Sequence, residues 1–242
     1  MKVTYVADLE HRDVMIAVYA LHYLGFLDYM VCYPESLSPE ARNRLKEIKG
    51  MGVKVKRKLK GKSNSVVIVN APLGCVARYL RKRDSHIKTL VVAGGFVGCN
   101  IEGSIENKEY SMVSNFNEEL GSTIEVLSSS YTKVDSIYLV TRNVYSSPLN
   151  YEKGIWSGSE FWELFQNIEV KDRYIPQYAL LTVMEGLHIA LDSQTRCEYI
   201  DLYPKFDYIE GRKTLWGSST YFVGIRKVHT AVRLRYNMGI EI

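Results

Sequence analysis

The sequence predicts an α/β protein built on one open, mostly parallel β-sheet with helices on both faces and a β-rich C-terminal part. Short apolar runs rich in β-branched residues alternate with segments of helical periodicity, which is typical of parallel sheets whose two faces are covered. The chain has 242 residues, a length that one large domain can fill, and no linker or internal repeat divides it. From Glu198 onward, β-rich runs follow one another. We therefore expect residues 1–242 to form a single domain.

Strands are predicted where β-branched and apolar residues cluster in short runs. These runs occupy residues 2–7, 53–59, 65–69, 89–93, 136–141, 198–204, 220–226 and 231–237. Helices are predicted where apolar residues recur at spacings of three and four. They occupy residues 13–30, 38–50, 76–83, 119–130 and 175–191. The second helix begins with Ser38 as N-cap and Pro39 at its first position, and it ends at Gly50.

The functional site is expected at one edge of the predicted sheet. In parallel sheets, ligands bind in the crevice beyond the carboxyl ends of the strands. The segments that follow predicted strands are 7–12, 70–75 and 94–98. The chain near Tyr178, where a predicted helix starts, is a further candidate. These segments are the candidates for the site.

Composition and cysteine usage predict a cytoplasmic protein that does not enter a membrane. No run of 18 apolar residues occurs, so no transmembrane helix is expected. The first residues carry acids where a signal peptide needs an apolar stretch. The four cysteines lie far apart without a CxxC pair, which favours reduced thiols and argues against zinc.

The net charge of +4 hides a strongly basic region between Arg42 and Lys88, with fifteen Lys or Arg against two acids. The remaining 195 residues carry sixteen basic and twenty-five acidic side chains. One interpretation is a patch for phosphate, nucleic acid or an acidic partner. The other is a solvated edge strand at 54–62, whose lysines discourage aggregation and which lacks interleaved aromatic residues.

Five segments carry motifs similar to those of one known family. Residues 6–13 (VADLEHRD) occupy the place of a DxDxxxDD signature, and 67–77 (VIVNAPLGCVA) are similar to a strand, a GPLTNLA turn and a helix. Residues 90–96 (LVVAGGF) resemble an MGG strand end, 114–117 (SNFN) an AEFN motif, and 176–183 (PQYALLTV) the start of an HDPLAVA helix. In order and spacing, these segments resemble the inosine/uridine-preferring nucleoside hydrolase family over nearly the whole chain.

The resemblance implies a calcium site that binds the ribose diol and the attacking water. The family builds this site from first-loop carboxylates, one backbone carbonyl and a late aspartate. This chain keeps Asp8 and Asp13, but Val6, Arg12 and Tyr178 replace the other carboxylates. Calcium takes six to eight oxygen ligands, several of them carboxylates. We therefore expect a lost calcium site and no cofactor, with calcium held by Asp8 and Asp13 as the alternative.

Arg12 brings a positive charge into the first loop. One hypothesis is that its guanidinium pairs with Asp8 or Asp13 and replaces the ion, whereas the other interpretation makes it a surface side chain. Glu10 and His11 are alternative metal ligands, or a general acid–base pair. In an active enzyme, Asp8 would be the catalytic residue, because the resemblance gives its position the role of activating water.

The residues expected to bind substrate follow from the same resemblance. Gln177 replaces the histidine that assists the leaving base, Asn115 replaces a ribose-binding glutamate, and Gly74 replaces a carbonyl-donating threonine while keeping a carbonyl. Asn117 is retained. The expected substrate-binding residues are Asn115, Asn117, Gln177, Tyr178, Gly94 and Gly95.

Three functions are open at this point. The first is a non-catalytic module that binds a nucleoside, a nucleotide or a sugar, or that serves as an interaction module. The second is an active N-glycosidase that uses Asp8 with a different metal site or with none. The third is binding of nucleic acid or an acidic partner through residues 42–88. The sequence does not predict an oligomeric state.

Overall fold

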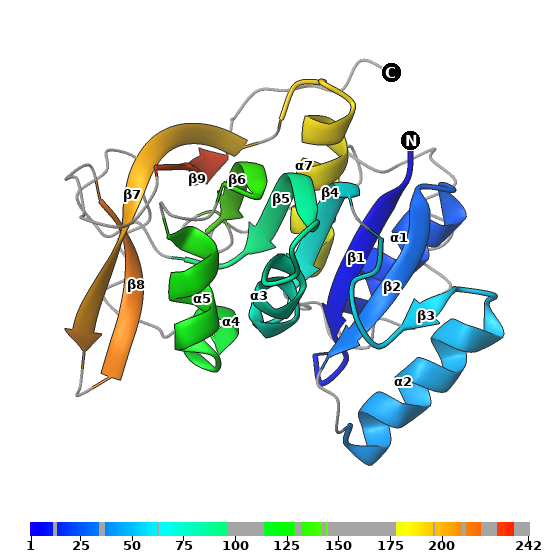
Figure 1. Ribbon diagram of the computed structural model, residues 1–242. Coiled ribbons are helices and arrows are strands. Elements are labelled where there is room, and N and C mark those ends of the chain that lie inside the picture. Colours follow the sequence, from blue (N-terminus) through cyan, green and yellow to red (C-terminus); the bar gives the residue numbers. More distant parts are fainter. Residues whose placement is uncertain are drawn as a thin grey trace.

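The computed structural model of the chain contains one large β-sheet with helices on its faces (Figure 1). The described residues are 1–11, 14–33, 37–61, 63–95, 114–128, 132–141, 144, 178–195, 197–209, 212–218 and 227–234. Within them the sheet has the strand order β3-β2-β1-β4-β5-β6-β9-β7-β8. Strands β1 to β6 pair in parallel, β9 is parallel to β6, and β7 runs antiparallel to β9 and β8. The predicted α/β class with a mostly parallel sheet is confirmed.

The strands lie close to the predicted positions in the first two thirds of the chain. Their bounds are β1 Val3–Asp8, β2 Leu27–Tyr33, β3 Val55–Lys56, β4 Ser63–Asn70, β5 His86–Ala93, β6 Val134–Val140, β7 Cys197–Ile209, β8 Arg212–Ser218 and β9 Val228–Leu234. The predicted strand at 220–226 lies outside the described residues, and β8 was not predicted. The expectation of a β-rich C-terminal part is met by β7, β8 and β9.

The helices form two layers, one on each face of the sheet (Figure 1). Helices α1 (Val14–Tyr23), α2 (Pro39–Gly50) and α7 (Tyr178–Ala190) pack on one face, and α3 (Gly74–Leu80), α4 (Ser114–Asn117) and α5 (Leu120–Leu127) on the other. The chain moves outward from β1 to β3 in one direction and from β4 to β6 in the other. Right-handed crossovers then place the connecting helices on opposite faces. None of the described helices is long and apolar enough to span a bilayer.

The core lies on both faces of the central strand β1, in which every residue is buried. Tyr5 and Ala7 face the layer of α1 and α7, whereas Val6 faces the layer of α3. A strand that is covered on both faces has a nearly continuous run of apolar residues in its sequence, because neither set of alternating side chains meets water. This explains why the first strand was recognisable from its sequence.

Two predicted elements differ from the structure. The helix predicted over residues 13–30 is wrong beyond Tyr23, because Gly25 adopts a φ of +70° and the chain turns into β2. The strand predicted over 53–59 shrinks to the two residues of β3, the edge strand of the sheet. By contrast, α2 begins as predicted, since the side chain of Ser38 accepts a hydrogen bond from the Ala41 backbone N–H at 3.1 Å.

Helix α7 approaches β4 so closely that its Gly186 lies against Ile68. A Cβ atom on Gly186 would lie 2.5 Å from Ile68 Cδ1 and 2.8 Å from Ile68 Cγ1, and Ile68 is fully buried. In α5, by contrast, a Cβ atom on Gly121 would meet nothing within 4 Å. The two helical glycines therefore differ in the room around them.

We predict opposite effects of alanine at these two positions. Gly186→Ala should lower the free energy of unfolding by about 1–2 kcal/mol, because overpacking against β4 outweighs the gain in helix propensity. Gly121→Ala should raise it by up to about 1 kcal/mol through helix propensity alone. Urea denaturation measures both changes. An increase in stability for Gly186→Ala would contradict the close approach of α7 to β4.

Candidate ligand site at the carboxyl edge of the sheet

Four neighbouring strands end at one edge of the sheet, which we call the carboxyl edge. Strand β1 ends at Asp8, β4 at Asn70 and β5 at Ala93. Ala7 pairs with Asn70, and Ala93 pairs with Val140 of β6, so these strands end nearly level. The loops expected to carry the site therefore start side by side, which is the arrangement in which parallel sheets bind ligands.

Asp8 is the central carboxylate of this edge and is only 3% exposed. Its Oδ1 accepts a hydrogen bond from the Glu10 backbone N–H at 3.0 Å, and its Oδ2 lies 3.7 Å from His11 Nε2. Burial raises the pKa of Asp8, and this effect outweighs the lowering by the Glu10 N–H and by His11. Asp8 is therefore a buried carboxyl whose ionised form is disfavoured by its surroundings.

Glu10, an expected alternative metal ligand, is engaged with α2. Its Oε1 accepts a hydrogen bond from the Ser38 backbone N–H at 2.9 Å, and hydrogen bonds from Ser38 lower the pKa of this carboxyl. Arg44 of α2 donates to the Leu9 carbonyl at 2.6 Å, which holds the same loop from its backbone side. The first loop is thus fixed to the start of α2 by polar contacts.

Two glutamates that the sequence analysis did not single out join Asp8 at the carboxyl edge. Burial and the charges of Glu119, Glu118 and Asp8 raise the pKa of Tyr33 to about 12. The pKa of Glu118 is itself raised, first by partial burial and then by the charges of Asp8 and Glu119. We call Asp8, Glu118 and Glu119 the carboxylate cluster. Their position directly after the SNFN segment was the signal that could have revealed Glu118 and Glu119.

Glu119 reaches into space that only a glycine leaves open. A Cβ atom on Gly74, the first residue of α3, would lie 1.5 Å from Glu119 Oε2. That oxygen is buried and has no hydrogen-bond partner among the described residues. A buried acceptor without a donor costs about 1–3 kcal/mol, so this oxygen calls for a donor that the described residues do not supply.

Asn115, Gly94 and Gly95 form the part of the carboxyl edge that lies at the end of β5. Asn115 is 6% exposed, and its Nδ2 donates to the Ala93 carbonyl at 3.0 Å. A Cβ atom on Gly94 would lie 2.5 Å from the buried Phe116 ring, and Gly95 adopts a φ of +91°. In this structure these residues hold the end of β5 against α4.

The remaining predicted site residues are only partly described. Asn117 ends α4 and Tyr178 begins α7, but only their backbone positions belong to the description. Arg12, Asp13 and Gln177 lie outside the described residues, so the pairing of Arg12 with Asp8 or Asp13 stays a prediction.

Calcium does not fit the described part of the site. No group of three or more His, Cys, Asp or Glu residues within it could hold a metal ion. One oxygen of Asp8 is engaged by a backbone N–H, and the Glu10 carboxylate is engaged by Ser38. Asp8, Glu118 and Glu119 act on one another through their charges, but they do not converge as the carboxylate ligands of a hard cation do.

The raised pKa of Asp8 predicts that this residue costs stability at neutral pH. A raised carboxyl pKa in the folded state favours folding below the ordinary value of 3.8, and the advantage is lost as the pH rises through the folded-state pKa. Asp8→Asn should therefore raise the melting temperature at pH 7 by roughly 2–4 °C, the effect of about 1 kcal/mol in a domain of this size. The gain should vanish near pH 3.

Differential scanning calorimetry at the two pH values measures this change. Asp84→Asn is the matched control, because Asp84 is exposed in the turn before β5, at the opposite edge of the sheet. This control should leave the melting temperature at pH 7 nearly unchanged. Equal melting temperatures of Asp8→Asn and the parent chain at pH 7 would contradict the assigned burial of the charge.

Comparison with known proteins assigns no function to the residues of this site. No protein-family model matches the sequence, and no curated protein matches it either. The case for a function therefore rests on the residues at the carboxyl edge and on the motifs that lead into them.

Proposed function

We propose that the chain is a nucleoside-hydrolase-like protein that binds a nucleoside, a nucleotide or a sugar at the carboxylate cluster without hydrolysing it. The observation that carries this proposal is the buried Glu119 Oε2, which has no hydrogen-bond partner among the described residues and whose carboxylate, like that of Asp8, acts electrostatically on Glu118. The mostly parallel sheet supports it as well, because the motif-bearing segments after β1, β4 and β5 start at one common edge.

The chemistry of the cluster suits a ligand rich in hydroxyl groups. An ionised carboxylate offers only acceptors, and a sugar diol offers two adjacent donors, so the two are complementary. Hydrogen bonds to a charged acceptor are shorter and stronger than those between neutral groups. A tyrosine hydroxyl is protonated at neutral pH, and Tyr33, whose pKa is raised further by burial and then by the cluster, can donate to a ligand oxygen.

The proposal excludes hydrolysis because the described residues supply only part of the required chemistry. Cleavage of an N-glycosidic bond needs an activated water, stabilisation of the developing positive charge on the sugar, and help for the departing base. Asp8 can take a proton from water, and the cluster can stabilise positive charge. No residue in the described part of the chain is placed to assist the departing base.

One observation favours a second candidate, an active N-glycosidase. The pKa of Asp8 is raised by burial, which makes this carboxylate a stronger base than an exposed aspartate. His11 Nε2 lies 3.7 Å from Asp8 Oδ2, so an imidazole that can carry a proton lies close to this carboxylate. This arrangement provides a metal-free route to an activated water.

We predict that ligand binding depends on Glu119. Calorimetric titration with inosine, uridine, their 5′-monophosphates and ribose should show binding of at least one of them to the parent chain. Glu119→Gln should weaken that binding about tenfold or more, because a hydrogen bond to a charged group is worth about 1.5–3 kcal/mol. Gly74→Ala should weaken it as well, since the added Cβ displaces the Glu119 carboxylate.

The matched control for these titrations is Asp84→Asn, which removes a carboxylate at the opposite edge of the sheet. Its binding should equal that of the parent chain. Absence of heat with all five ligands at millimolar concentration, or equal binding by Glu119→Gln, would contradict the proposal.

A turnover assay separates the two candidates. We expect release of ribose from inosine and uridine to stay at the buffer background over hours at neutral pH. Ribose release well above that background, abolished by Asp8→Asn and retained by Asp84→Asn, would replace the non-catalytic proposal with the N-glycosidase.

A further inference from the structure

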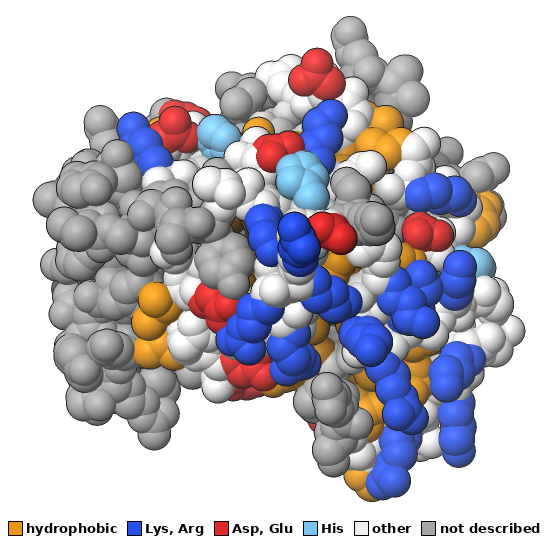
Figure 2. All heavy atoms as spheres, in the orientation of Figure 1, with side chains coloured by type: hydrophobic (Ala, Val, Ile, Leu, Met, Phe, Trp, Pro, Cys, Tyr) orange, Lys and Arg blue, Asp and Glu red, His pale blue; other side chains and the backbone are white. Residues whose placement is uncertain are grey.

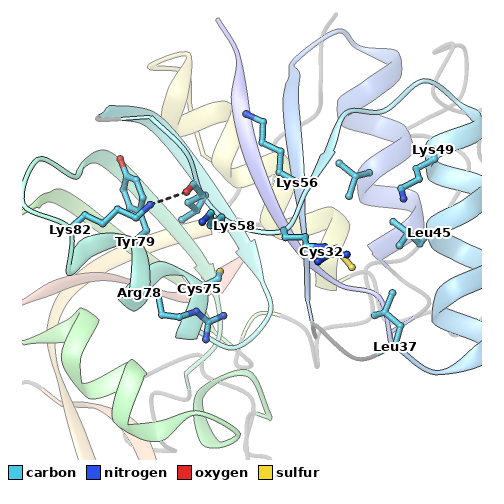
Figure 3. Close-up of a pocket in the computed structure, with 13 residues that line it drawn as sticks. Cys32, Leu37, Leu45, Lys49, Lys56, Lys58, Cys75, Arg78, Tyr79 and Lys82 are labelled. Atoms are coloured by element: carbon cyan, nitrogen blue, oxygen red, sulfur yellow. Dashed lines mark hydrogen bonds between the residues drawn. The ribbon is translucent and has the colours of Figure 1, made fainter.

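A cleft of about 740 Å³ crosses the edge of the sheet at β3 and reaches Cys32 near the end of β2 and Cys75 at the start of α3, so it borders the carboxyl edge (Figure 3). Its walls come from α2 and β2 on one side and from α3 on the other, with the segment after β3 between them. Thirteen of the described residues line it, and among these six are basic and none is acidic. The basic ones are Lys49, Lys56, Arg57, Lys58, Arg78 and Lys82. We call this feature the basic cleft.

The positive charges of the cleft and its surroundings act on one another. The pKa of Lys56 is lowered first by burial and then by the charges of Lys54 and Lys60, with only Asp28 opposing them. Figure 2 shows this excess of positive charge as a band of Lys and Arg side chains that extends from α3 to α2 across this face. A surface with this field attracts polyanions from solution.

The cations are spread along the cleft and do not surround one point. Lys49 lies in the last turn of α2, Lys82 follows the end of α3, and Lys58 lies on the segment between them (Figure 3). Arg57 precedes Lys58 on the same segment. Helix C-termini carry partial negative charge and do not themselves attract an anion. A row of cations of this kind matches a ligand with repeated phosphates better than a single phosphate.

The described residues of the cleft offer no aromatic face on which a base could stack. Tyr79, the one aromatic residue among the described lining residues, is only 1% exposed. The neighbouring Tyr29 is 2% exposed, and the Lys56 ammonium covers its ring at 3.4 Å from the centroid. Binding of single strands relies on stacking as well as charge, whereas binding of a duplex backbone relies on charge alone.

We propose that the basic cleft binds the sugar–phosphate backbone of double-stranded nucleic acid without sequence preference. This assignment is independent of the ligand at the carboxylate cluster. Phosphate contacts carry no sequence information, and their affinity falls steeply with salt because bound counterions are released. Six cations set an upper limit of about −5 for the slope of log binding constant against log salt concentration.

The test uses fluorescence anisotropy with two unrelated 20-base-pair DNA duplexes, a duplex RNA and a single strand, at 50–200 mM salt. The cleft variant Arg57→Gln/Lys58→Gln/Lys82→Gln changes three exposed cleft residues. The control variant Lys2→Gln/Lys88→Gln/Lys227→Gln removes the same number of charges from exposed residues outside the cleft. Thermal denaturation verifies that both variants are folded.

The parent chain should bind both DNA duplexes with equal dissociation constants in the micromolar range. The cleft variant should lose at least tenfold in affinity at 100 mM salt, and its salt slope should fall by about 2–3. The control variant should stay within about threefold of the parent chain. Nucleoside titrations should give the same result for all three proteins, which keeps this test separate from the proposed function.

Four outcomes would overturn the proposal. Equal losses of affinity in the two variants would show that binding depends only on the net charge of the protein. A tenfold difference between the two DNA sequences, or tighter binding of the single strand, would contradict contact with a duplex backbone. Binding of polyglutamate as tightly as duplex at the same salt would assign the cleft to an acidic protein partner instead.

Discussion

The parallel pairing of β1 with β2 on one side and with β4 on the other determines where both candidate surfaces lie. Because β1 is buried along its whole length, its two neighbours and the helices on both faces must close around it. The chain then leaves the centre in two directions, which places α1 and α2 on one face and α3 on the other. The level strand ends form the carboxyl edge, and the narrow flank at β3 brings α2 and α3 to the two sides of the basic cleft.

The acidic and basic surfaces meet at the end of β2. Burial and then the carboxylate cluster raise the pKa of Tyr33, and Arg78 of the cleft opposes that effect. Burial and Asp8 raise the pKa of Cys32 to about 11, whereas Lys49 lowers it. The positive charge of the basic cleft and the negative charge of the carboxyl edge therefore lie next to each other. The two surfaces differ in charge although they are neighbours.

The sequence revealed those features that depend on neighbours along the chain. The cap formed by Ser38 and Pro39 is local, and the central strands are covered on both faces, so periodicity and capping residues identified them. Strand β2 was missed because its apolar residues continue the pattern of α1, and only Leu24, Gly25 and Phe26 separate the two elements. The role of Glu119 was hidden for a different reason, since its contact with Gly74 exists only after folding.

The order of strands in the sheet has a consequence for how the chain acquires its structure. Thr4 of β1 pairs with Val67 of β4, so the two middle strands of the part from β3 to β6 meet only after the whole β1–β3 segment has been made. Contacts between residues so far apart in sequence form slowly, because a long loop must close before the pairing stabilises it. Until then, one edge of an apolar strand is open to pairing with other chains. Productive folding during synthesis therefore depends on β4 arriving before another chain pairs with that edge.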